Sequence, residues 1–363
     1  MHLYQAIAAA TVAADVAAAA RFAMYYDQWH PATPNKAAME GITHVVTAFA
    51  GTTLFNSDPA QSYTPFTDVA TLRTQFPDGV KVCMAIGGWG DTAGFSVGQK
   101  DDASRKMYAK GVASTLDSLG YDCVDVDWEY PGGNGEDYRQ NPNSGKVDEI
   151  TGYALLLQEI KAAIGDKELS IAVPGKKGDM IAFTPEQAPL INDAVDVINV
   201  MTYDLMNRRD NVTNHHTSVK GSLETVDNYL ALGFDPAKMN LGFAFYAKFF
   251  KTQGECTQPI GCPTVLLENP DGSDPGLSGA VTFLENPDVL PLGQADTENG
   301  GQWYWEPSTN YFWTWDTPDF VAQKFNDIVK ARGLGGVMAW SLGEDSSDLT
   351  YIKAMQAGLA TLE

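Results

Sequence analysis

Residues 122–129 read Asp-Cys-Val-Asp-Val-Asp-Trp-Glu, a run of four carboxylates inside a segment whose apolar residues favour a β-strand. Strand side chains alternate between two faces, so Asp125, Asp127 and Glu129 point the same way and Asp122 points the other. If the strand is buried, Asp125, Asp127 and Glu129 share one interior space, where repulsion between like charges raises the pKa of at least one of the three carboxyl groups. Such crowding costs stability and indicates catalysis. An acidic edge strand or a calcium loop is the alternative, but neither suits the Tyr-Pro-Gly-Gly that follows.

Apolar, strand-like segments recur along the chain with helical segments between them. Both faces of these strands are apolar, which is typical of parallel strands covered on both sides. Eight strands alternating with helices predict an α/β protein with a (β/α)8 TIM barrel, whose active site lies at the carboxyl ends of the strands, where Glu129 falls. We expect strands at 21–26, 44–49, 80–86, 123–129, 169–173, 197–202, 241–246 and 336–341, and helices at 103–119, 153–164, 223–232 and 318–332.

One connection is too long for a barrel loop. Residues 248–315 follow the seventh strand and are rich in Pro, Gly, Tyr and Trp. A structureless loop of that length is uncommon in a compact domain, so this segment is expected to form a small α+β insertion lobe that overhangs the cleft. The barrel then consists of residues 21–247 and 316–363.

The N-terminus is Ala-rich and ends in Ala17 to Ala20, a small-residue pattern that suits signal peptidase. Two features are atypical of a signal peptide: Asp15 lies inside the apolar stretch, and no Lys or Arg precedes that stretch. A short Ala-rich helix on the bottom of the barrel is the alternative. We expect residues 1–20 to be a signal peptide and the protein to be secreted.

The cysteines and paired histidines give few indications of a metal site. Cys256 and Cys262 lie six residues apart in a loop-like segment, which favours a disulfide in an oxidising compartment. Cys83 and Cys123 each fall inside predicted strands and are expected to be buried free thiols. The adjacent histidines at 215–216 lack nearby ligand spacing, so we expect them to hydrogen-bond within a loop and predict no metal.

The composition excludes several kinds of partner. The 363 residues are 44% hydrophobic and 11% aromatic, as expected of a well-packed globular protein. A formal charge of −22 argues against nucleic acid and anionic membranes, and is compatible with a neutral or cationic substrate. No apolar run after residue 23 is long enough to cross a bilayer. We expect a monomer.

The acidic strand and four other motifs together resemble glycoside hydrolase family 18, the chitinases and their relatives. Residues 122–129 fit the family's DxxDxDxE signature, and the segment 248–315 resembles the chitinase insertion domain. The resemblance covers about residues 21–362. The other motifs follow in the family's order: Ile86-Gly87-Gly88-Trp89 resembles SxGGW, Met201-Thr202-Tyr203-Asp204 resembles MxYD, Phe245-Tyr246-Ala247-Lys248 resembles FYGR, and Met338-Ala339-Trp340 resembles the end of strand eight.

The resemblance implies retaining hydrolysis of β-1,4-linked N-acetylglucosamine, as chitin or chitooligosaccharides, without a cofactor. Glu129 would protonate the glycosidic oxygen while the substrate's own acetamido oxygen attacks C1, and would then activate water. Asp127 would bind the acetamido N–H, and Asp125 would exchange a proton with Asp127. Tyr203 would hold the acetamido oxygen in place. Substrate binding is implied for Trp340, Asp204, Trp89, Tyr130, Tyr246, Met201, Tyr25, Phe49 and Lys248.

Some of these residues also have ordinary structural interpretations. Tyr25, Phe49 and Trp340 are candidates for packing inside the barrel. Trp89 fits a surface aromatic in a Gly-rich turn, although the resemblance would place it against a sugar at subsite +1.

Three positions depart from the family pattern. Ala85 replaces a Ser that hydrogen-bonds the innermost Asp in relatives, which leaves Tyr25 as the main candidate partner of Asp125. Arg209 stands where many relatives have an aromatic platform, and Lys248 where Arg is common. Each change removes a planar or bidentate contact in the cleft, where the leaving-group subsites are expected.

Two other functions are compatible with the motifs. One is an endo-β-N-acetylglucosaminidase acting on the chitobiose core of N-glycans, although the insertion lobe and Trp89 favour a linear polymer. The other is a non-catalytic chitin-binding lectin, a type that lacks the catalytic Glu or the middle Asp. Both of those residues are present here. The single glycosylation sequon, at residues 211–213, follows the MxYD-like motif near the expected cleft.

Overall fold

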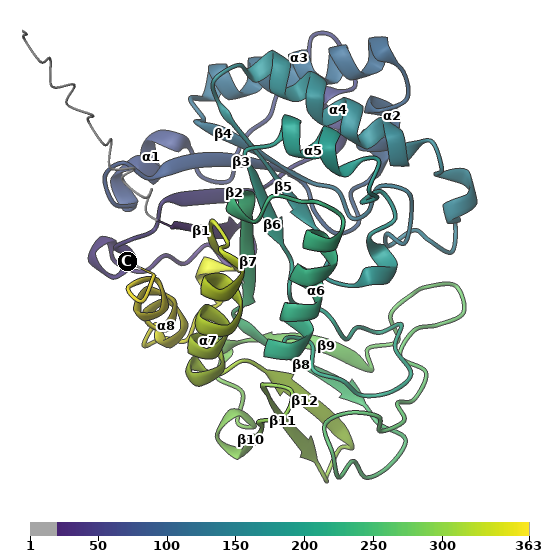
Figure 1. The fold of residues 1–363 in the computed structure, drawn as a ribbon, viewed down its shortest axis with the longest axis vertical. Coiled ribbons are helices and arrows are strands. Elements are labelled where there is room, and N and C mark those ends of the chain that lie inside the picture. The colour runs from purple at the N-terminus through teal and green to yellow at the C-terminus, as the bar shows by residue number, and fades with distance from the viewer. Residues whose placement is uncertain (1–19, 363) are drawn as a thin grey trace, which may run out of the picture.

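The computed structural model describes residues 20–362 and has a closed parallel barrel at its centre. Its eight strands follow the order β1-β13-β7-β6-β5-β4-β3-β2, and helices surround it (Figure 1). The predicted (β/α)8 barrel is confirmed, and each strand end lies within two residues of the predicted one. The barrel strands are β1 (Arg21–Asp27), β2 (His44–Ala50), β3 (Lys81–Gly87), β4 (Cys123–Asp127), β5 (Glu168–Val173), β6 (Val197–Val200), β7 (Met239–Ala244) and β13 (Gly336–Trp340).

The helices cover the outside of the barrel and include the four predicted from periodicity. The last of those four is not uniform, since its second half, Phe325–Lys330, is π-helical. The α-helices are α1 (Val69–Gln75), α2 (Ala93–Gly98), α3 (Asp102–Leu119), α4 (Glu149–Ile164), α5 (Ala188–Ala194), α6 (Val219–Ala231), α7 (Pro318–Lys324) and α8 (Thr350–Leu359). No helix within residues 20–362 has the length and apolarity needed to span a membrane.

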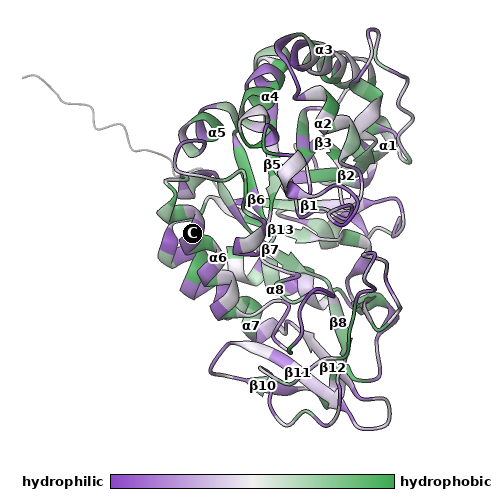
Figure 2. Cartoon of the chain, turned by 90° about the vertical axis from the view of Figure 1, so that its right-hand side faces the viewer, coloured by the Kyte–Doolittle hydropathy of each residue, from purple (hydrophilic) through white to green (hydrophobic). Residues whose placement is uncertain are grey.

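Alternation along each strand separates two cores. In β4, Val124 and Val126 join the large core between strands and helices, while Cys123 and Asp125 point into the barrel. The apolar colour concentrates in the barrel strands and is mixed with polar colour on the helices, as expected for strands buried on both faces (Figure 2). Because of this alternation, the acidic residues of β4 lie inside the barrel.

A second, smaller sheet follows β7 and lies beside the carboxyl ends of the barrel strands. It is five-stranded, in the order β10-β11-β12-β8-β9, and its pairings are antiparallel. Among the described residues its helical content is limited to short 3-10 turns such as Phe283–Glu285 and Leu290–Leu292. The sheet begins at Tyr246, and its strands are β8 (Tyr246–Lys251), β9 (Ser278–Thr282), β10 (Gln294–Asp296), β11 (Gly301–Glu306) and β12 (Tyr311–Trp315).

The expectation of free thiols at Cys83 and Cys123 is wrong, because the two form a disulfide. They lie on adjacent strands, β3 and β4, and the register places them directly opposite each other with Cα atoms 4.4 Å apart. The sequence predicts both strands but not the register that pairs these two positions. The structure also joins Cys256 to Cys262, the pair expected from its spacing.

We expect the double variant Cys83→Ala/Cys123→Ala to lower the free energy of unfolding by about 2–4 kcal/mol. The bond closes a loop of 40 residues, whereas Cys256–Cys262 closes one of only 6, so removing the second bond has a smaller effect. Urea unfolding of the two double variants measures both changes. An unchanged midpoint after loss of the Cys83–Cys123 bond would contradict the prediction.

Candidate active site

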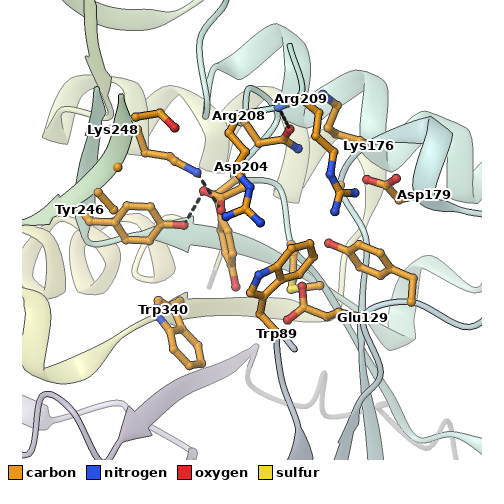
Figure 3. Close-up of a pocket in the computed structure, with 18 of the residues that line it drawn as sticks. Trp89, Glu129, Lys176, Asp179, Asp204, Arg208, Arg209, Tyr246, Lys248 and Trp340 are labelled. Atoms are coloured by element: carbon orange, nitrogen blue, oxygen red, sulfur yellow. Dashed lines mark hydrogen bonds and ion pairs between the residues drawn. The ribbon is translucent and has the colours of Figure 1, made fainter. Parts of the chain in front are cut away.

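A cavity of about 420 Å³ opens at the carboxyl ends of the barrel strands, beside the second sheet. Figure 3 shows Trp340 and Tyr246 at one end of this pocket and Arg209, Lys176 and Asp179 at the other, with Glu129 near the middle. The pocket contains eleven of the thirteen predicted catalytic and substrate-binding residues. These are Phe49, Trp89, Asp127, Glu129, Tyr130, Met201, Tyr203, Asp204, Tyr246, Lys248 and Trp340.

The other two predicted residues, Tyr25 and Asp125, lie beneath the pocket inside the barrel. Asp125 is fully buried and accepts hydrogen bonds from Tyr25 Oη (2.8 Å), Ser170 Oγ (2.5 Å) and Asn199 Nδ2 (3.2 Å). Burial raises the pKa of Asp125, and these three donors oppose the rise. Tyr25 is therefore one of three partners, and Ser170 on β5 supplies a hydroxyl that Ala85 on β3 lacks.

Asp127 lies above Asp125 at the end of β4 and has a free hydrogen-bonding atom. Its Oδ1 is buried and has no partner among the described residues. Burial, together with the negative charges of Glu129 and Asp125, raises the pKa of Asp127 well above its usual range. A buried carboxyl oxygen without a partner is costly, so it is suited to a polar group that a ligand brings.

Glu129 follows β4 and reaches the pocket half-buried. Burial raises the pKa of Glu129 to about 7; the negative charges of Asp204 and Asp179 add to the rise and a hydrogen bond from Tyr130 opposes it. A carboxyl group with that pKa is partly protonated near neutrality and can both give and take a proton. The acidic strand thus holds Asp125, Asp127 and Glu129 in a column that ends in the cavity.

Asp204 lies in the pocket opposite Glu129 and carries a negative charge. Burial alone would raise the pKa of Asp204, but the positive charge of Lys248 and contacts with His216 hold it well below its usual range. Lys248 Nζ lies 2.9 Å from Asp204 Oδ2, and Tyr246 Oη donates to Oδ1 at 2.9 Å. These contacts fix the side chain of Asp204 at the pocket wall.

An aromatic group forms the floor at one end of the pocket. Trp340 stacks on Phe49 with ring centroids 5.6 Å apart and an angle of 16° between the rings, and it also contacts Tyr25. Trp29, which the sequence did not single out, lies 6.4 Å from Phe49 and is 60% exposed. Exposed indole faces bind the apolar faces of flat ligands, so this end suits a ring-shaped ligand.

Charged residues occupy the other end of the pocket, and the sequence missed most of them. Lys176 and Asp179 lie at this end, and Arg208 and Asp274 also line the pocket; none of the four belongs to a motif (Figure 3). Arg209 places its guanidinium over the rings of Trp89, at 5.4 Å, and Tyr138, at 4.0 Å. The charged residues come from three separate segments, the loops after β5 and β6 and the loop between β8 and β9, so only the fold brings them together.

The adjacent histidines take part in structural contacts. His215 contacts Thr314 Oγ1 at 3.0 Å and Asp296 Oδ2 at 3.1 Å, while His216 packs on the ring of Tyr246. Within residues 20–362, no group of three or more His, Cys, Asp or Glu side chains is placed to hold a metal ion.

A parallel barrel with carboxyl groups at its mouth, one with a pKa near neutrality, and with exposed tryptophans beside them, has the features of a glycoside hydrolase. The family model described as "Glycosyl hydrolases family 18" matches residues 21–345. The chain therefore belongs to glycosyl hydrolase family 18.

Individual relatives agree with this assignment. The chain is 27% identical over 308 residues to sporulation-specific chitinase 2 of Saccharomyces cerevisiae, covering 77% of this chain and 58% of the relative. It is 25% identical over 386 residues to chitinase 1 of Aphanocladium album, covering 93% and 85%. Thus the chain spans little more than half of the first relative but most of the second.

Solved structures share the fold. The Group II chitinase catalytic domain 2 of Ostrinia furnacalis superposes with a TM-score of 0.76 at 23% identity, covering 95% of this chain and 97% of that one. A chitinase of Rhizomucor miehei gives 0.75 at 20% identity, covering 93% and 99%. A Cycas revoluta chitinase mutant solved with (GlcNAc)4 gives 0.72 at 21%, covering 95% and 100%.

Proposed function

We propose that the protein hydrolyses β-1,4 bonds between N-acetylglucosamine units with retention, using the acetamido group of the substrate as nucleophile. The observation that carries the proposal is the column in which Glu129 lies in the pocket above Asp127, whose buried Oδ1 finds no hydrogen-bond partner within residues 20–362. An acetamido N–H is a donor of the kind that this oxygen lacks. The chitinase relatives and the (GlcNAc)4 complex of the Cycas protein support chitin as the substrate class.

The proposed reaction proceeds in two steps. Protonated Glu129 gives its proton to the glycosidic oxygen while the acetamido oxygen attacks C1, which yields an oxazolinium ion and releases the leaving sugar. Glu129, now ionised, takes a proton from a water that attacks C1 and reopens the ring. Asp127 holds the N–H and stabilises the developing positive charge, while Asp125 shares its proton below. Tyr203 lies beside the column and donates to the acetamido oxygen.

Two readouts separate this proposal from its alternatives. Colloidal chitin and a high-mannose glycoprotein are incubated with the protein, and the sugars released are measured. Products from chitin alone support the chitinase. Release of the N-glycan would favour an endo-β-N-acetylglucosaminidase, and binding without release from either substrate would favour a lectin.

The pKa of Glu129 sets the alkaline limit of activity. The acid must be protonated in the free enzyme, so we expect kcat/KM to fall as pH rises through about 7. Asp179 adds to the raised pKa through its negative charge, so Asp179→Asn moves this limit to lower pH. The pH profiles of kcat/KM for both proteins measure the shift. A limit that stays in place or moves upward would contradict the assignment of Glu129 as the acid.

Ser170 acts on the reaction through Asp125. A hydrogen bond to a charged group contributes about 1.5–3 kcal/mol, so we expect Ser170→Ala to lower kcat/KM by about tenfold. Residues 85 and 170 flank Asp125 on the neighbouring strands β3 and β5, at the same register. Adding Ala85→Ser should therefore recover much of the lost kcat/KM, and the pH profile of the double variant should return toward that of the wild type. Full activity of Ser170→Ala, or no recovery in the double variant, would contradict this role.

We also propose that the protein is secreted and monomeric. Two disulfides favour an oxidising compartment. The signal peptide expected at residues 1–20 lies almost wholly outside the described residues.

A further inference from the structure

We infer that a group of side chains joining the insertion lobe to two barrel loops closes the leaving-group end of the cleft, so that the enzyme cleaves close to the reducing end of a chain. We call this group the clasp; it consists of Tyr138, Arg208, Arg209 and Glu268. The inference rests on the proposed hydrolysis and adds where along the polymer it occurs.

Glu268 is the centre of the clasp. It belongs to the insertion lobe, and its side chain is only 5% exposed. Its carboxylate accepts from Tyr138 Oη at 2.5 Å and from Arg208 Nε at 3.2 Å, and it lies 3.5 Å from Arg209 Nε. One buried carboxylate thus binds the loop after β4 and the loop after β6 at the same time.

Further contacts extend the connection on both sides of Glu268. Arg208 donates to the carbonyl of Gly272 at 3.3 Å, and Gln140 donates to the carbonyl of Asp271 at 2.9 Å, so lobe backbone meets both barrel loops. Arg209 donates to the carbonyls of residues 134 and 135 at 2.7 and 2.9 Å, and it stacks on Tyr138. The three loops are therefore linked by side chains and backbone together.

The clasp lies at the charged end of the pocket. Arg209 lines the cavity there and also covers Trp89, and Arg208 and Asp274 line the cavity as well. Figure 3 shows Arg209 and Asp179 at the opposite end from Trp340. If Trp340 lies under the sugar whose C1 reacts, then Glu129 faces this end and the leaving group departs toward the clasp.

The consequence follows from the shape of a polymer. A groove that is open at both ends can take a chain anywhere along its length, whereas a groove closed at one end accepts only a chain end there. Closing the leaving-group side restricts binding to the reducing end and makes the departing fragment short. Removing Glu268 leaves arginines that repel one another, so the clasp should open.

The test uses N-acetylchitohexaose labelled at its reducing end. For the wild type we expect the label mainly on a mono- or disaccharide. Glu268→Ala should raise the share of label on a trisaccharide or longer by about tenfold, because a buried charged group that joins the loops is lost. Tyr138→Phe, which removes one donor and keeps the ring under Arg209, should give an intermediate share.

Glu298→Ala is the matched control, since Glu298 is exposed on the same lobe and its side chain makes no hydrogen bond or ion pair among the described residues. It should keep the wild-type label pattern. Melting temperatures and turnover of a short fluorogenic chitobioside show that each variant is folded. Two results would overturn the proposed role of the clasp alone. One is a wild type that leaves the label on fragments of many lengths, and the other is a folded Glu268→Ala variant with the wild-type label pattern. No hydrolysis of any chitin substrate by the wild type would overturn the proposed function as well.

Discussion

Replacing Glu129 with Gln should lower kcat on chitooligosaccharides by about 10²–10⁴-fold, the usual contribution of a general acid and base. Gln keeps the size and the hydrogen-bonding ability of the side chain, but it has no proton to give and cannot take one from water. Substrate binding depends on the pocket walls, so the dissociation constant should change by no more than a few-fold. Single-turnover hydrolysis and calorimetric titration separate the two effects.

Asp122→Asn provides the control within the same acidic segment. Asp122 faces away from the barrel interior and pairs with Arg73 at 2.9 Å, with both side chains partly exposed. We expect activity within about threefold of wild type and a loss of stability of no more than about 1 kcal/mol, as for an exposed ion pair. Near-wild-type turnover in Glu129→Gln, or equal losses in the two variants, would contradict the role of Glu129.

Replacing Asp127 with Asn should have the second largest effect, lowering kcat by about 10²–10³-fold, as when a preorganised polar group at a reaction centre is removed. The amide is the same size, but it carries no negative charge to stabilise the oxazolinium ion. It also cannot share a proton with Asp125 below. Because the charge matters most in the transition state, kcat should fall far more than KM rises.

The same change should alter the titration of Glu129. The negative charge of Glu129 helps to raise the pKa of Asp127, and because the repulsion between two charges is reciprocal we expect the charge of Asp127 to act on Glu129 in turn. Asp127→Asn removes one of these charges, so the alkaline limit of kcat/KM should move to lower pH. A loss confined to KM, with the pH profile unchanged, would indicate that Asp127 serves only to bind substrate.

The sequence predicts the barrel and the acidic column because both follow from local patterns. Strand alternation places Asp125, Asp127 and Glu129 on one face, and apolar runs locate the strands to within two residues. The family motifs then locate ten of the residues that line the pocket, since each motif lies at the carboxyl end of a strand. Asp122 lies outside the column, as its parity predicted.

Contacts that depend on register could not be predicted in this way. Ser170 and Asn199 reach Asp125 because β5 aligns with β4, and β6 with β5, at particular residues. Cys83 and Cys123 likewise meet because of the register between β3 and β4. A strand can be located from its own residues, but its offset from a neighbouring strand depends on the closure of the whole barrel.

Contacts between loops were also missed. Glu268 lies in an insertion with no recognisable motif, and its partners are at least 59 positions away in sequence. Trp29 and Asp179 likewise reach the pocket from loops whose paths the sequence does not define. Lys248 and Arg209, by contrast, were noted as departures, and both are engaged, with Asp204 and Tyr138 respectively.

The most direct test of substrate participation is the inhibition constant of chitobiose thiazoline, a stable cyclic mimic of the oxazolinium ion. If the acetamido oxygen is the nucleophile, this compound should compete with substrate and bind at least about 10²-fold more tightly, as intermediate-like ligands do. Lack of inhibition by the thiazoline at concentrations where chitobiose itself binds would contradict the account. The group that attacks C1 would then have to come from the protein or from water.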